Sequence, residues 1–347
     1  MVELIKLKFG SKPGFVFLDE IQRRDNAGLF LKGIYDRGLP HKLIVSGSGS
    51  LELKEKIQES LAGRKRIFRL NTVSFFKWID YLTNYQYQGK LAQYLSLNPE
   101  KTKEYLDQYL NFGGYPRVIL AASLEEKSAI LNEILTSYLE KDIRYLGVER
   151  EEIFRSLLKL IASQTSQLVN HQNLSQTLGT TQVTVKKYLW YAQKTFVIQK
   201  VTPLAKRVHR EISKAPVYYF TDLGIRNLLL GSLGLVQSPL QLSFLFQNLI
   251  FLFLEQIAQE KYYQIKYWRT KSGAEVDFVL EKGEKLLPVE VKYQSLKEKR
   301  VSRSLRSFIN IYQPKQALVV NLDFKAETKI GSTQVVFLPF WSITYFT

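Results

Sequence analysis

Apolar residues near the start of the chain form two short continuous runs. Residues 15–18 (FVFL) and 43–45 (LIV) are apolar at every position, and polar residues follow each run directly. Buried strands of a parallel sheet have this pattern, whereas half-buried strands alternate. The runs therefore predict two buried parallel strands whose carboxyl ends carry polar side chains.

Residues 73–142 have helical spacing instead. Apolar residues recur every three or four positions, and glycine and proline at 113–116 interrupt the pattern. Because these residues end or start helices rather than continue them, the segment predicts several helices in succession.

A helix-turn-helix is predicted within the next segment, residues 151–234. A short helix ends at Gly179, a second begins at Thr181, and apolar runs at 196–198 and 217–220 predict a two-stranded wing. Such a domain places its second helix in the major groove of DNA. The residues predicted to contact DNA are Thr184, Lys187, Tyr191, Lys194, Lys206, Arg207 and Arg210. The alternative is a structural module that packs between neighbouring domains.

The final segment, residues 235–347, combines an amphipathic helix with strands. Side chains alternate across a strand, so Glu275 and Asp277 are predicted to share a face, as are Glu290 and Lys292. The residues predicted to point into the core are Val276, Phe278, Val289 and Val291. The expected elements are a helix at 244–259, strands at 264–269, 274–280 and 286–293, a helix at 300–312 and a strand at 317–321.

This order of elements resembles the restriction-endonuclease-like, PD-(D/E)xK fold. In nucleases of that fold such carboxylates bind Mg²⁺ or Mn²⁺, and the lysine activates or orients water. The resemblance implies a metal site at Asp277 and Glu290, with Lys292 in a catalytic role. Its members commonly have a glutamate on the first helix, where this chain has Gln247, and an amide is the weaker metal ligand. The alternative is a half-buried sheet with a charged outer face.

The polar residues after the first two strands are typical of part of a nucleotide site. Asp19 and Glu20 can bind Mg²⁺ and polarise an attacking water, and Ser46 and Ser48 can meet a γ-phosphate. Arg64 is a candidate to reach the phosphate of a neighbouring subunit. The phosphate-cradling sequence G-x-x-x-x-G-K-[ST] is absent from the 347 residues. The alternative for 15–20 is a core strand that ends in an acidic turn.

Taken together, the spaced motifs resemble the AAA-type ATPases of archaea and bacteria that carry a C-terminal domain of unknown function of the DUF4143 type. The further motifs are NFGGYP (111–116), SYLEKD (137–142), VYYFTDLG (217–224) and WRTKSGAEVD (268–277). The resemblance implies an α/β protein in four parts: the C-terminal part of a P-loop AAA-type core (1–72), a helical lid (73–150), a winged helix-turn-helix domain (151–234) and a PD-(D/E)xK nuclease-like domain (235–347).

The same resemblance implies cofactors and an assembly. ATP and Mg²⁺ are expected, held in part by Asp19, Ser46 and Ser48, and homo-oligomers are expected to form through the ATPase core. In that family a phosphate-binding loop lies upstream of the first strand found here. We therefore expect either an N-terminal truncation or a relative that has lost the loop, and no useful ATP turnover by these 347 residues.

Composition narrows the choice of partner. The net charge is +17, and residues 151–222 and 223–347 each carry +6 of it, which favours a polyanion and predicts DNA. With no cysteine and three histidines, disulfides and thiolate metal sites are excluded and zinc is not expected. The most apolar stretch, 242–254, is interrupted by polar residues, and no signal peptide is recognised, so a soluble, cytoplasmic protein without a membrane partner is predicted.

Two function classes remain open at this point. The first is an AAA-type ATPase joined to a nuclease-like domain that acts on DNA. The second is a nucleic-acid-binding or regulatory protein that uses both folds for contacts alone, because both catalytic centres are incomplete.

Overall fold

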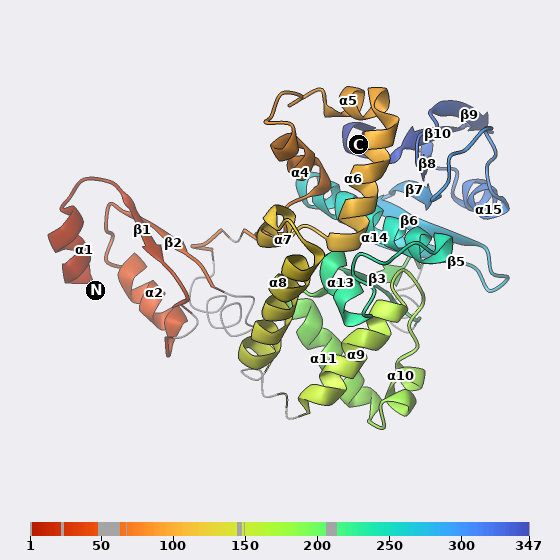
Figure 1. Cartoon of the computed structure of the whole chain (residues 1–347). Coiled ribbons are helices and arrows are strands. Elements are labelled where there is room, and N and C mark those ends of the chain that lie inside the picture. Colours follow the sequence, from red (N-terminus) through yellow and green to blue (C-terminus); the bar gives the residue numbers. More distant parts are fainter. Residues whose placement is uncertain are drawn as a thin grey trace.

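The computed structural model describes residues 2–21, 24–47, 63–66, 68–143, 148, 150–205 and 214–346. Four of the predicted site residues, Ser48, Lys206, Arg207 and Arg210, lie outside the described residues. Figure 1 shows a small N-terminal unit beside a larger body of helices and one long sheet.

The N-terminal unit is a two-stranded parallel sheet covered by helices on one face. Its elements are α1 (Val2–Phe9), β1 (Phe15–Leu18), α2 (Ala27–Tyr35) and β2 (Lys42–Val45). Both predicted strands and their parallel pairing are confirmed.

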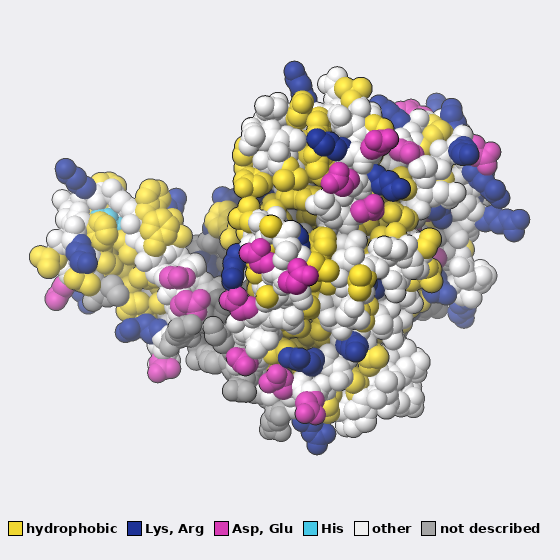
Figure 2. All heavy atoms as spheres, in the orientation of Figure 1, with side chains coloured by type: hydrophobic (Ala, Val, Ile, Leu, Met, Phe, Trp, Pro, Cys, Tyr) yellow, Lys and Arg dark blue, Asp and Glu magenta, His cyan; other side chains and the backbone are white. Residues whose placement is uncertain are grey.

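The prediction that the first strand is buried on both faces is wrong. Val16 and Leu18 pack against the helices, but Phe17 on the opposite face is 71% exposed. Because the described helices cover one face alone, alternate side chains of a continuous apolar run are left in solvent. Figure 2 shows hydrophobic side chains on the surface of the N-terminal unit.

A run of short helices follows, as predicted. Prolines occupy first-turn positions of two of them, where the missing N–H costs nothing, and Ser123 Oγ caps another by accepting from the N–H of Glu126. The elements are α4 (Phe75–Leu82), α5 (Leu91–Leu97), α6 (Pro99–Phe112), α7 (Pro116–Leu120), α8 (Leu124–Ser137) and a π-helix (Tyr138–Ile143).

The predicted helices and strand pair of the middle segment are present. Thr181 Oγ1 accepts from the N–H of Thr184 and so starts the second helix of the pair, while β3 and β4 are antiparallel. The name winged helix stays a prediction. The elements are α9 (Glu151–Ser163), α10 (His171–Thr177), α11 (Gln182–Lys194), β3 (Ile198–Pro203), β4 (Val217–Phe220) and α13 (Leu223–Leu229).

The predicted order of elements in the last segment is confirmed, and two strands were missed after it. The elements are α14 (Pro239–Lys261), β5 (Gln264–Arg269), β6 (Glu275–Lys282), β7 (Lys285–Val291), α15 (Arg303–Tyr312), β8 (Gln316–Asn321), β9 (Ala326–Ile330), β10 (Thr333–Pro339), a 3-10 helix (Phe340–Ser342) and α16 (Ile343–Phe346).

Helix α14 is longer than the apolar stretch predicted. By length and composition it is the one helix among the described residues that could cross a membrane, but half of its most apolar window is buried inside the protein. It packs on α6, β4, β5 and β7, so burial in the core accounts for its apolar character.

One eight-stranded sheet joins the middle and last segments. Its order is β4-β3-β5-β6-β7-β8-β10-β9, and β3 joins β5 in parallel through Thr202↔Lys266 and Pro203↔Tyr267. The predicted wing is therefore one end of this sheet rather than a separate hairpin. Helix α14 covers one face of the sheet and α15 covers the other (Figure 1).

Two of the recognised motifs form a tight joint between α6 and α13. The buried carboxylate of Asp222 accepts from the N–H of Gly114 at 2.8 Å and of Ile225 at 3.1 Å. A Cβ on Gly113 would lie 2.4 Å from Asp222 Oδ1, and one on Gly224 would lie 2.2 Å from the carbonyl oxygen of Phe112. Glycine is required here because the two backbones approach too closely for a side chain.

Candidate functional site

The predicted C-terminal site lies where β6 and β7 separate. Their pairing ends at Phe278↔Val289, and beyond that point Asp277 Oδ2 accepts the N–H of Val291 at 2.8 Å. The side chain thus takes a hydrogen bond that a neighbouring strand would otherwise make. We call this point of separation the fork of β6 and β7, and the Asp277 carboxylate lies in it between the two strands.

Glu290 and Lys292 complete the cluster, as their shared face predicts. Lys292 Nζ lies 2.7 Å from Glu290 Oε1, and Ser302 Oγ donates to Glu290 Oε2 at 2.9 Å. The same Ser302 oxygen accepts the N–H of Leu305, so it caps α15 and fixes a buried carboxylate at once.

The charges of the cluster are coupled. Burial, together with the negative charge of Glu290, raises the pKa of Asp277 to about 7. Burial alone would lower the pKa of Lys292, but the adjacent Glu290 and Asp277 outweigh it and raise that pKa. Near neutral pH the site therefore takes up or releases a proton readily.

Glu275 has a different environment from the one predicted. Its carboxylate lies 3.3 Å from Arg269 Nη1, and its N–H donates to Ser304 Oγ at 3.2 Å. The predicted alternation also fails here, because Val276 packs on the α15 side of the sheet and Phe278 on the α14 side. The pairing of β5 with β6 shifts between Lys266↔Val279 and Trp268↔Val276, so β6 has one extra residue here, which accounts for the irregularity.

Gln247 is directed toward the same region. Its Nε2 donates to the hydroxyl of Tyr219 at 3.1 Å, and the charges of Asp277 and Glu275 act on that hydroxyl. Burial raises the pKa of Tyr219 far above its usual range, and the negative charges of these carboxylates raise it further. The helix face that carries Gln247 therefore belongs to the surroundings of the site.

The cluster offers two carboxylates to a cation. Among the described residues, no group of three or more His, Cys, Asp or Glu side chains is placed to hold a metal ion. Mg²⁺ commonly uses one or two carboxylates and completes its shell with water and substrate phosphates. Asp277 and Glu290 fit such a site, although Lys292 and Ser302 already engage both Glu290 oxygens.

The N-terminal candidates meet at the ends of β1 and β2. Asp19 Oδ1 accepts from the N–H of Glu20 at 2.9 Å and from Ser46 Oγ. Glu20 has a left-handed backbone (φ 51°), which is uncommon for a residue other than glycine. These groups fit the Mg²⁺ and water side of a nucleotide site, but no phosphate-cradling sequence accompanies them among the 347 residues.

Arg64 is engaged within its own chain. Its Nη1 lies 3.1 Å from Asp36 Oδ1, and both side chains are more than 40% exposed. A pair this exposed contributes little to stability. Contact with a neighbouring subunit stays a prediction.

The residues of α11 predicted to contact DNA differ in exposure, and Tyr191 does not lie on the outer face as expected. Lys187 is exposed and Lys194 half-buried, but the Tyr191 side chain is only 8% exposed. At about 100° per residue, Tyr191 lies roughly 110° from the centre of the buried face, close enough for its ring to turn inward beside Tyr188. Thr184 bonds Thr181 at the helix start.

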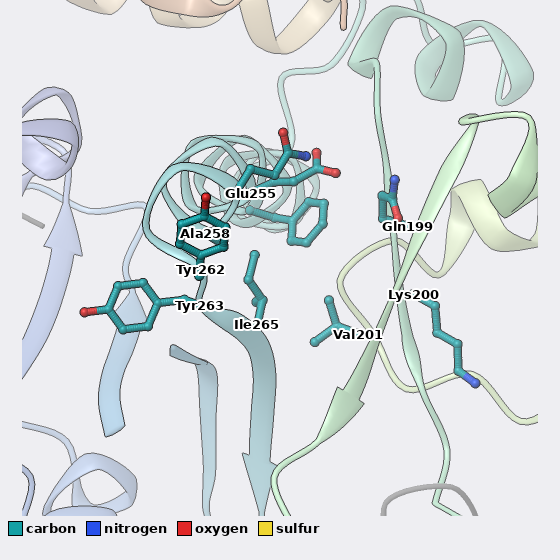
Figure 3. Close-up of a pocket in the computed structure, with 10 residues that line it drawn as sticks. Gln199, Lys200, Val201, Glu255, Ala258, Tyr262, Tyr263 and Ile265 are labelled. Carbon is teal, nitrogen blue, oxygen red and sulfur yellow. The ribbon is translucent and has the colours of Figure 1, made fainter. Parts of the chain in front are cut away.

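A pocket of about 520 Å³ lies elsewhere, between β3 and the end of α14 (Figure 3). Glu255 and Gln199 lie on opposite sides of it in that view, and Val201 and Ile265 lie below them. Arg69 Nη1 lies 3.0 Å from Glu255 Oε1, and the guanidinium lies 4.5 Å from the ring centroid of Phe196. None of the sequence-predicted site residues lines this pocket.

Comparison with known proteins agrees with the N-terminal and C-terminal motifs. An AAA domain family model matches residues 1–78, and the domain of unknown function DUF4143 matches residues 243–341. A further domain of unknown function, DUF8612, matches residues 103–235. Together these matches support an AAA-type protein with a C-terminal DUF4143 domain.

Relatives that bear the name uncharacterized protein occur in bacteria and archaea. Proteins of Mycobacterium tuberculosis and Mycobacterium bovis are each 28% identical over 87% of this chain, which spans 63% of their length. A Haemophilus influenzae protein is 23% identical over 86% of the chain and 70% of its own length. A Methanocaldococcus jannaschii protein is 23% identical over 99% of the chain and 78% of its own length.

Sequence reasoning missed two residues of the C-terminal site. Ser302 fell inside the helix predicted at 300–312, whereas it is the N-cap of α15, a position that serine favours. Its bond to Glu290 has no local signal. Tyr219 stands in a recognised motif, yet no local pattern connects it with Gln247, which is 28 residues away.

Proposed function

We propose that this protein acts on DNA and joins an AAA-type domain, which hydrolyses ATP only together with a phosphate-binding loop, to a C-terminal centre that binds a divalent cation and a DNA phosphate. The observation that carries the proposal is the cluster of Asp277, Glu290 and Lys292 in the fork of β6 and β7. The +6 charge of residues 223–347 supports a polyanionic ligand there. Figure 2 shows Lys and Arg side chains gathered over the part of the surface formed by this domain.

Each residue of the cluster has a separate task in this proposal. Asp277 and Glu290 would hold the cation, which when bound would neutralise charge on the phosphate and activate water. Lys292 would exchange its bond to Glu290 for one to a phosphate oxygen or the water. Ser302 would keep Glu290 in place during that exchange, because its bond to Oε2 does not involve the lysine.

The outer face of α11 is the proposed second contact with DNA. Lys187 and Lys194 lie on the side of the helix opposite its buried face, and Lys186 and Trp190 are exposed beside them. Ammonium groups that contact phosphates contribute affinity without sequence preference, so this surface would position DNA rather than read its sequence.

Calorimetric titration of Mn²⁺ into wild type, Glu290→Ala and Gln247→Glu tests the centre. Glu290→Ala should weaken binding strongly, and Gln247→Glu should strengthen it because a carboxylate replaces an amide at the edge of the site. Glu284→Ala removes an exposed carboxylate from the turn between β6 and β7 and serves as the control. Negligible Mn²⁺ binding by all four proteins would refute the proposal.

A second candidate is a protein that contacts DNA through this domain without cleaving it. The full engagement of both Glu290 oxygens and the amide at position 247 favour this reading. Fluorescence anisotropy with labelled duplex DNA separates the two. Binding that is independent of Mn²⁺ and unaffected by Glu290→Ala supports contact alone, whereas Mn²⁺-dependent nicking lost in Glu290→Ala supports catalysis.

ATP hydrolysis is tested separately. Asp19, Glu20 and Ser46 supply the metal and water side of a nucleotide site, but the phosphate-cradling sequence is not among the 347 residues. We therefore expect no saturable, Mg²⁺-dependent turnover from this chain alone. Turnover that Glu20→Gln abolishes would contradict this expectation.

A further inference from the structure

One tyrosine of the middle segment reaches into the C-terminal domain. Tyr219 lies on β4, inside the match at 103–235, whereas Gln247, Asp277 and Phe278 lie inside the match at 243–341. Its neighbours on the strand, Tyr218 and Phe220, face the opposite way into the core around α9 and α11. Because successive side chains point to opposite faces, Tyr219 is directed at α14 and β6.

Tyr219 is held from three sides. Its ring stacks on Phe251 of α14, with centroids 4.4 Å apart and planes within 10°. It lies 5.4 Å from the ring of Phe278, the residue that follows Asp277. Its hydroxyl accepts from Gln247 Nε2 at 3.1 Å. Since the side chain is fully buried, these contacts define a single position for it.

The Tyr219 hydroxyl keeps its own proton while its oxygen accepts from Gln247. Its O–H is therefore left to donate to a different acceptor. The carboxylates of Asp277 and Glu275 are near enough for their charges to act on it. Tyr219 is therefore a neutral donor near Asp277, one of the two carboxylates proposed to hold a cation.

We propose that Tyr219 is a positioning residue for the Asp277 centre. It fixes the carboxamide of Gln247 through its hydroxyl and the β6 segment that carries Asp277 through its ring. The metal site of the DUF4143 domain is thus completed by a residue of the preceding domain. This inference rests on the proposed function, because it assigns a part in the same centre.

Tyr219→Phe tests the proposal, since it keeps the ring and its stacking and removes only the hydroxyl. Mn²⁺ affinity of the full chain, measured by electron paramagnetic resonance of free Mn²⁺, should fall about tenfold, as is typical when an outer partner of a metal ligand is lost. Tyr218→Phe is the matched control, because its buried hydroxyl bonds His171 Nε2 at 3.2 Å on the opposite face. It should leave Mn²⁺ affinity unchanged.

A double-mutant cycle separates positioning from a general loss of packing. The single variant Gln247→Leu and the double variant Gln247→Leu, Tyr219→Phe should have similar Mn²⁺ affinities, because the two side chains act as one unit. Additive losses, or wild-type affinity in a folded Tyr219→Phe, would overturn this inference and leave the proposed function intact. If wild type binds no Mn²⁺, the proposed function and this inference are both overturned.

Discussion

Gly224→Ala tests the joint between α6 and α13 because two physical effects predict opposite signs. Gly224 lies in the first turn of α13, where alanine should stabilise a helix by about 1 kcal/mol. However, its Cβ would lie 2.2 Å from the carbonyl oxygen of Phe112, whereas about 3.0 Å is the shortest approach that Cβ atoms show. The backbones would have to separate by about 0.8 Å.

Hydrogen bonds across the joint oppose that separation. Asp222 accepts from Gly114, and Asn227 Nδ2 donates to the carbonyl oxygens of Leu110 and Asn111, each at 2.9 Å. Overpacking of a core costs about 1–3 kcal/mol, and each weakened bond adds about 1 kcal/mol. The variant should therefore be destabilised by roughly 3 kcal/mol or more, so that steric crowding outweighs helix propensity.

Urea denaturation followed by tryptophan fluorescence measures the effect. Gly179→Ala is the control: Gly179 has a left-handed backbone (φ +59°), but nothing lies within 4 Å of its Cβ position. Backbone conformation alone would make Gly179→Ala the more harmful change, because a side chain in the left-handed region costs about 1–2 kcal/mol. A midpoint for Gly224→Ala equal to or above that of Gly179→Ala would refute the reasoning.

Three further predictions concern charged groups. Burial and Glu290 raise the pKa of Asp277 to about 7 from 3.8, so the folded protein retains a proton that the unfolded chain releases, and stability falls as the pH rises through this interval. Asp277→Asn should therefore be more stable than wild type at pH 8, by up to about 4 kcal/mol, and equally stable near pH 3. Thermal unfolding at both pH values measures the difference in stability. An equal gain in stability at both pH values would contradict the prediction. Arg69→Ala leaves the Glu255 carboxylate buried without its partner and should lower the free energy of unfolding, measured by urea denaturation, by about 3–5 kcal/mol. The double variant Arg69→Met, Glu255→Leu should recover most of this stability. No recovery would show that the loss comes from packing rather than from charge. Replacing Lys187 and Lys194 by alanine should weaken DNA binding across sequences in anisotropy titrations, and the salt dependence of the affinity should fall by up to about two phosphate contacts. The same change at the exposed Lys101 and Lys103 of α6 should have neither effect. Equal effects of the two double variants would assign the DNA contact to overall charge.

Local patterns predicted much of the C-terminal site. Glu290 and Lys292 are two residues apart on one strand, so alternation alone places them together, and their contact at 2.7 Å agrees. Asp277 was predicted to converge on them from the adjacent strand. The sequence could not predict how, because its bond to the N–H of Val291 depends on the point where β6 and β7 stop pairing.

Features that depend on distant residues were not predictable in this way. The pairing of β3 with β5 joins residues 64 positions apart, as does the bond between Lys266 and Thr202. Asp222 and Gly114 were recognised as parts of separate motifs, and only the fold brings them together across 108 residues. Tyr191 was misplaced because a position at the margin of a helix face is buried or exposed according to what packs beside it.

The pairing of β3 with β5 has a consequence for how such proteins can be inherited and rearranged. A recombination event that exchanged residues 243–341 alone would expose the unpaired N–H and C=O groups of β5 and leave Thr202 and Pro203 without a neighbouring strand. Exposed strand edges pair with other chains and promote aggregation. Exchange of the C-terminal domain should therefore be tolerated only when the preceding hairpin is carried with it.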